Sequence, residues 1–70
     1  MSLYNHDWRK VIKILKKFGF DVTRQRGSHL ILKKDGKIIS VPRHSPIAMP
    51  TLRSILIQAG IPEDDFVKFL

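Results

Sequence analysis

The chain has 70 residues, a formal net charge of +7 and no cysteine. A chain of this length is typical of one small domain with a modest core, so we expect residues 1–70 to fold as a single unit. The absence of cysteine excludes disulfides, thiolate metal sites and a cysteine nucleophile. The sequence shows no apolar run long enough for a membrane span and no signal peptide, so we expect a cytoplasmic protein.

The charge is unevenly distributed along the chain. Half of the six acidic residues lie in 63–65, and the remainder of the chain is therefore strongly basic. A small basic domain indicates an acidic partner, most often a nucleic acid. The alternative is a solvated basic surface that serves no specific partner.

The first predicted element is a helix over about residues 6–18. Asn5 or Asp7 can cap its start, and Gly19 can end it in the left-handed conformation. Its lysine and arginine residues form either a solvated face or a phosphate-contacting face. The apolar residues recur at helical spacing and predict a stripe that faces the core; they are Trp8, Val11, Ile12, Leu15 and Phe18.

Three antiparallel strands are predicted next, over residues 20–24, 29–34 and 37–41. Gly27 marks the first turn, and Asp35-Gly36 is a strong signal for a two-residue hairpin. Side chains alternate between the two faces of a strand.

This alternation predicts which side chains face the helices. Phe20 and Val22 share the apolar face of the first strand, and Leu30 and Leu32 share that of the second. His29 then lies on the opposite face or at the edge, where solvent reaches it.

Two more helices complete the chain. After a loop over 43–50, Pro50 suits the first turn of a helix that Gly60 ends, and Pro62 starts a short last helix. We expect the buried side of this last helix to consist of Phe66, Phe69 and Leu70.

The order of these elements predicts an α+β, two-layer α-β-β-β-α domain. A three-stranded antiparallel sheet carries the helices on one face, and a short extra helix follows. The same order occurs in the double-stranded RNA-binding fold, although order alone does not establish RNA binding.

The segment Arg26-Gly27-Ser28-His29 is the main candidate site. Histidine titrates near neutral pH, so an exposed His29 on a basic surface suggests acid–base chemistry on a phosphodiester. The alternative is a polar residue that opens a strand and bonds a carbonyl. His44 is a second acid–base group, a phosphate contact or a loop histidine without a role. The candidate RNA contacts are Arg24, Arg26, Gly27, Ser28, Lys33 and His44.

No metal or cofactor is expected. The three histidines and six acidic residues lack metal-ligand spacing, and no phosphate-binding or dinucleotide motif is present. The acidic run at 63–65 is better explained as the start of a helix.

Several segments, in order, resemble the HicA-type toxin family, the small mRNA-cleaving partners of type II toxin–antitoxin pairs. Arg26-Gly27-Ser28-His29 resembles the family's Gly-Ser-His turn, and Val41-Pro42-Arg43-His44 resembles its Val-Pro-x-His strand end. Residues 51–61 resemble its second helix. Met49-Pro50 departs from the family, which usually has glycine before this helix.

The resemblance implies a double-stranded RNA-binding-like fold that is used by an endoribonuclease toxin. It implies one catalytic histidine, which maps to His29, and a HicB-type antitoxin that covers this surface. It also implies cleavage of mRNA and inhibition of translation, and acid–base catalysis by a histidine predicts that this cleavage is metal-independent. The alternatives are a non-catalytic RNA-binding module of the same fold and a subunit whose basic face binds an acidic protein.

Overall fold

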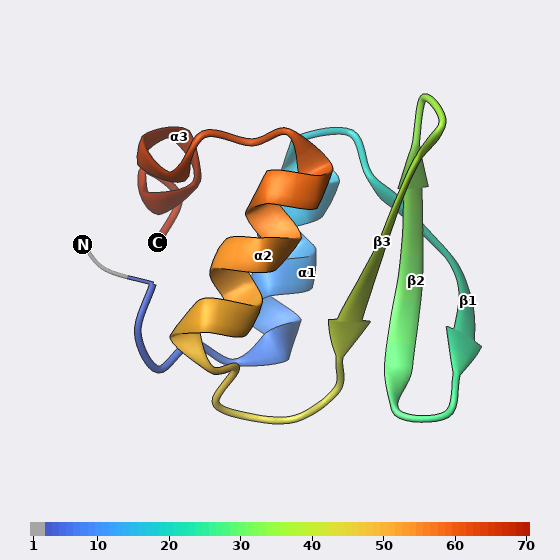
Figure 1. Ribbon diagram of the computed structural model, residues 1–70, viewed down its shortest axis with the longest axis horizontal. Helices are drawn as coiled ribbons and strands as arrows, with labels where there is room; N and C mark the ends of the chain where they lie inside the picture. Colours follow the sequence, from blue (N-terminus) through green and yellow to red (C-terminus); the bar gives the residue numbers. More distant parts are fainter. Residues whose placement is uncertain (1–2) are drawn as a thin grey trace.

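The computed structural model describes residues 3–70. Its three strands form an antiparallel sheet in the order β1-β2-β3, and α1 and α2 lie together on one side of it (Figure 1). This arrangement confirms the predicted α+β fold with a short extra helix. The elements are α1 (Trp8–Lys17), β1 (Asp21–Arg26), β2 (His29–Lys34), β3 (Lys37–Pro42), α2 (Met49–Ala59) and α3 (Glu63–Val67).

The core lies between the helices and the β2–β3 half of the sheet. Leu32 is fully buried, as predicted, and Leu30 is partly buried against the same cluster. Ile14 was absent from the predicted stripe of α1 but is buried. The helices contribute Val11, Ile12, Ile14, Leu15, Leu52, Ile55 and Leu56, and the last two strands contribute Leu32, Ile39 and Val41.

Both hairpin turns form where the sequence predicts them. Asp35 and Gly36 have φ values of 47° and 82°, which is the type I′ pattern of positive φ at both central residues. Gly27 has φ 56° between the paired residues Arg26 and His29. β1 consequently ends two residues later than predicted, at Arg26, because pairing continues to the turn.

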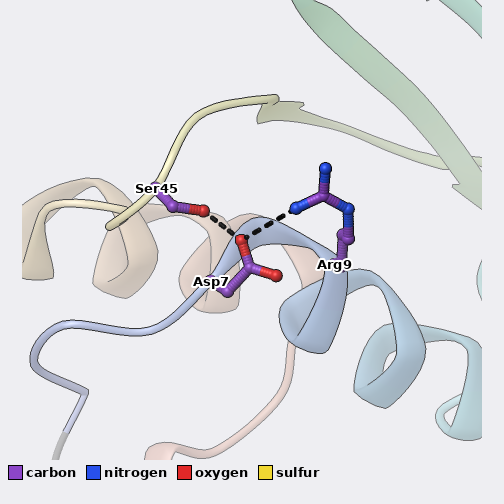
Figure 2. A network of polar contacts seen from close by, with 3 residues as sticks. All are labelled: Asp7, Arg9 and Ser45. Carbon is purple, nitrogen blue, oxygen red and sulfur yellow. Dashed lines mark hydrogen bonds and ion pairs between the residues drawn. The ribbon is translucent and has the colours of Figure 1, made fainter.

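The start of α1 differs from the prediction. Asp7 occupies the N-cap position, but its side chain makes no capping hydrogen bond. Its carboxylate instead accepts hydrogen bonds from Ser45 Oγ and from the Arg9 guanidinium (Figure 2). The bond from Ser45, followed by the charge of Arg9, lowers the pKa of Asp7. Asp7 therefore connects the start of α1 to the loop after β3.

Two apolar residues predicted to face the core are exposed. Val22 is 38% exposed, and every residue of β1 is exposed, because the helices lie beside β3 and leave β1 at the uncovered end of the sheet (Figure 1). Phe69 is 44% exposed. It follows the end of α3 and meets Phe18 edge to face at 5.5 Å between ring centroids.

Among the described residues, no helix is long and apolar enough to cross a membrane.

Candidate active site

The first hairpin holds His29 at the end of the central strand. Gly27 and Ser28 form the turn, and Arg26 is the direct cross-strand neighbour of His29. Gln25 Nε2 donates to the Gly27 carbonyl at 2.9 Å, and the Arg43 amide donates to the Ser28 carbonyl at 2.7 Å. The turn is thus bound on one side by β1 and on the other by the residue that follows β3.

A β-bulge decides which face the arginines of β1 occupy. Strict alternation would put Arg24 and Arg26 on the same side as Val22, toward the helices. Val22 pairs with Leu32, whereas Arg24 pairs with Ile31, so Thr23 is the extra residue of a bulge. Its Oγ1 donates to the Ile31 carbonyl at 3.3 Å.

The bulge therefore brings Arg24 and Arg26 to the open face of the sheet, together with His29. Arg26, His29, Ile31 and Ser40 line one shallow hollow on this face. Arg24 lies two pairs further along the sheet, opposite Ile31. Lys33 lies on the same face but four residues from His29, roughly 13 Å along the strand.

The His29 side chain is exposed, and within residues 3–70 its imidazole forms no hydrogen bond or ion pair. The bond to a carbonyl that the alternative of a strand-opening polar residue allowed is therefore not formed. His29 also lines a hollow of about 450 Å³ between the sheet and α2, which we call the His29 groove. Its lining residues are His29, Ser40, Pro42, Pro50, Thr51, Ser54, Ile55 and Gln58.

The α2 side of the His29 groove was missed by the sequence analysis. Thr51, Ser54 and Gln58 recur at helical spacing, which predicts one polar face of α2, and this pattern was available in the sequence. Their hydroxyl and amide groups can donate and accept hydrogen bonds. They can therefore contact ribose or base edges of a strand that lies against His29.

The remaining predicted site residues differ in their placement. A Cβ added at Gly27 would meet no atom within 4 Å, so a ligand can approach this backbone closely. Ser28 is exposed beside it. His44 is exposed in the loop after β3, but it is not among the residues that line the His29 groove.

Within residues 3–70, no group of three or more histidine, cysteine or acidic side chains is placed to hold a metal ion. The groove offers one imidazole, neutral hydrogen-bonding groups and an arginine at its border. These groups can transfer a proton and stabilise negative charge on a bound phosphate.

Comparison with known protein families matches residues 8–61 to the family described as the HicA toxin of bacterial toxin–antitoxin systems. The chain belongs to the HicA toxin family. Membership supports a role as a toxin with an antitoxin partner. The match includes His29 and the bulged strand, whereas α3 and Phe69 lie outside it. No curated protein matches the chain.

Proposed function

We propose that this HicA-family toxin is an endoribonuclease that cleaves mRNA by acid–base catalysis at His29. The observation that carries the proposal is the exposed imidazole at the border of the groove, with Arg26 directly opposite. RNA supplies its own nucleophile, the 2′-hydroxyl. The protein has to move protons and stabilise the charge that develops on phosphorus.

In the proposed reaction, the 2′-oxygen loses its proton and bonds to phosphorus. The bond from phosphorus to the 5′-oxygen breaks, and that oxygen gains a proton. The products are a 2′,3′-cyclic phosphate and a 5′-hydroxyl. His29 acts as the base in the first proton transfer or as the acid in the second, a role that contributes roughly 10²- to 10⁴-fold to a rate.

The remaining contacts in this proposal use the open face of the sheet and the loop after β3. Arg26, and Arg24 beyond it, supply positive charge to the phosphate as the negative charge builds up. Gly27 allows the phosphate to approach, and Ser28 donates a hydrogen bond. Lys33 and His44 bind phosphates further along the strand of RNA. No metal takes part in this mechanism.

The test is cleavage of end-labelled RNA by the purified chain in the presence of EDTA. We expect 2′,3′-cyclic phosphate ends, and a loss of about 10²-fold or more in rate for His29→Ala. His6→Ala is the matched histidine control, because His6 lines neither hollow that contains His29 and its backbone bonds that of Ile47. Loss of all cleavage in EDTA would replace this mechanism with a metal-dependent one.

The same experiment separates the toxin from a non-catalytic module of the same fold. A module would retain labelled RNA without turnover, and His29→Ala would bind and behave as the wild type does. Toxicity on expression that disappears with His29→Ala would support a role in inhibiting translation.

We further propose that the antitoxin is of the HicB type and covers the His29 groove, and that the toxin acts on mRNA in the cytoplasm. Co-expression with the product of a neighbouring small gene tests this proposal. We expect a stable complex in which RNA cleavage is suppressed and the His29 imidazole is shielded from chemical modification. A complex that leaves cleavage intact would contradict it.

A further inference from the structure

A second groove lies on the helical layer of the molecule. It has a volume of about 360 Å³ and is lined by Arg9, Lys10, Lys13, Ile14, Lys17 and Phe69. We call it the α1 groove. It shares no lining residue with the His29 groove, which lies between the sheet and α2.

The cations of the α1 groove are largely uncompensated. Its lining contains four basic side chains and no acidic one. Arg9 has an ion pair with Asp7, at 3.5 Å. Within residues 3–70, Lys10, Lys13 and Lys17 have no ion pair with a carboxylate. These three lysines follow one side of α1 over roughly 10 Å of helix.

The aromatic ring of Phe69 lies between these cations and the end of the chain. It is 44% exposed, its edge contact with Phe18 fixes its orientation, and Lys17 Nζ lies 5.0 Å from its centroid. Lys17 has a flexible stem and is exposed, so its ammonium can move to a phosphate while a planar group takes the ring face.

We propose that the α1 groove is a second RNA-binding site, in which one nucleobase stacks on Phe69 and Lys13 and Lys17 bind the adjoining phosphates. Cations that follow the backbone, next to an aromatic platform, are the general means of binding single-stranded nucleic acid. The volume is at the small end of the range for ligand sites, so it suits one nucleotide at a time.

Two other partners fit the observations less well. A membrane surface would require an apolar helix face to insert, but the apolar face of α1 is buried in the core. An acidic protein would pair with the lysines, yet it gives no particular reason for an exposed aromatic ring among them. RNA uses both features.

The consequence is that RNA bound at the α1 groove and RNA bound at His29 occupy two separate surfaces of the molecule. A strand long enough to reach both would bind more tightly than one that reaches either alone. Choosing RNA as the ligand draws on the proposed function, but binding at the α1 groove does not require cleavage.

Binding is measured by fluorescence anisotropy with labelled single-stranded oligouridine of about 16 nucleotides, using His29→Ala chains so that the probe stays intact. Lys13→Gln combined with Lys17→Gln should weaken binding by about 5-fold per lysine near 0.1 M salt and lower the salt slope by about 1.4. Lys16→Gln is the matched control for each lysine. It removes a charge from the same helix but does not line the groove, so the slope should change by less than half as much.

The stacking contact has its own test. Phe69→Leu keeps an apolar side chain, and it should weaken binding by at least about 5-fold. A photoreactive 5-iodouridine in the probe should cross-link to the Phe69 peptide in the wild type and not in Phe69→Leu. Thermal unfolding checks that Phe69→Leu is folded. If it is not, the lysine variants, which change only exposed side chains, carry the test.

These measurements separate this proposal from the proposed function. RNA that binds and cross-links as described, without any cleavage by the wild type, would support the α1 groove and contradict the endoribonuclease. Cleavage in which Lys13→Gln, Lys17→Gln and Phe69→Leu change neither KM nor cross-linking would overturn the α1 groove alone. Binding of an acidic polypeptide there, with no RNA binding, would also overturn it.

Discussion

The His29 groove and the α1 groove have similar volumes, about 450 and 360 Å³, but very different linings. The His29 groove is lined by one imidazole and neutral side chains, and its nearest arginine lies at the border. The α1 groove is lined by four cations, an aromatic ring and Ile14, and its lining contains no histidine. The net charge of the chain therefore says little about where chemistry occurs.

This contrast predicts a separation of kinetic effects. Changes around His29 should lower kcat, because they alter groups that act on the transition state. Changes in the α1 groove should raise KM and leave kcat unchanged, because they remove binding that the ground state and the transition state share.

After His29 itself, the largest effect is expected from the cations on the open face. Arg26→Gln should lower kcat by up to about 10²-fold, because Arg26 lies directly opposite His29 and can stabilise charge on the phosphate. Arg24→Gln should have a smaller effect, and Lys33→Gln the smallest, following their distances from His29.

Single-turnover kinetics on labelled RNA measure this series, and Lys13→Gln is the comparison from the other groove. Equal losses of kcat for Arg26→Gln and Lys13→Gln would remove the distinction between the two grooves. Equal losses for Arg26→Gln and Lys33→Gln would show that the open face acts only through its overall charge.

A smaller effect is expected at the hairpin turns, which provide a matched pair. Gly27 and Gly36 have φ values of 56° and 82°, and an added Cβ at either meets no atom within 4 Å. Gly27→Ala and Gly36→Ala should each destabilise the fold by about 1–2 kcal/mol, because an L-residue is strained at positive φ.

Only Gly27→Ala should also reduce RNA cleavage, since its turn leads into His29. Urea unfolding and cleavage assays on both variants measure the two quantities. If Gly36→Ala reduces cleavage as much as Gly27→Ala does, loss of stability alone accounts for both.

The smallest effect concerns Asp7, whose pKa is lowered by the Ser45 hydrogen bond and by Arg9. A carboxylate with a lower pKa in the folded state stabilises that state above its unfolded pKa, and this contribution disappears as pH falls through the folded pKa. Asp7→Asn should therefore lose less stability on acidification than the wild type does.

Thermal unfolding at neutral and acidic pH measures this difference. Asp21→Asn is the control, because it removes a carboxylate that is exposed on β1. If Asp7→Asn loses as much stability on acidification as the wild type does, the acid sensitivity comes from other groups. Arg9 lines the α1 groove, so Asp7→Asn should also strengthen RNA binding there slightly.

The sequence predicted the fold and the position of His29 because both follow from local patterns. Strand alternation and two turn signals were enough to place the imidazole on the open face at the start of β2. The polar face of α2 was also present in the sequence as a spacing, but nothing local indicates that it lies opposite His29.

The remaining features depend on contacts between elements. The bulge at Thr23 arises from pairing with β2, so strict alternation puts Arg24 and Arg26 on the wrong face. Phe69 is of a residue type that is usually buried in a core. It is exposed because it lies beyond the end of α3 at Val67. Asp7 is a residue type that commonly caps helices, but its carboxylate instead accepts a hydrogen bond from Ser45, which is distant in the sequence.

The uncovered position of β1 has a consequence for where local unfolding of this protein begins. Its six exposed residues bury little apolar surface, whereas β2 and β3 are anchored by Leu32, Ile39 and Val41. Segments with few buried contacts unfold locally at a lower free energy than the core. Amide hydrogens of β1 should therefore exchange with deuterated solvent well before those of β3, so that the arginines can detach from the sheet while His29 stays in place.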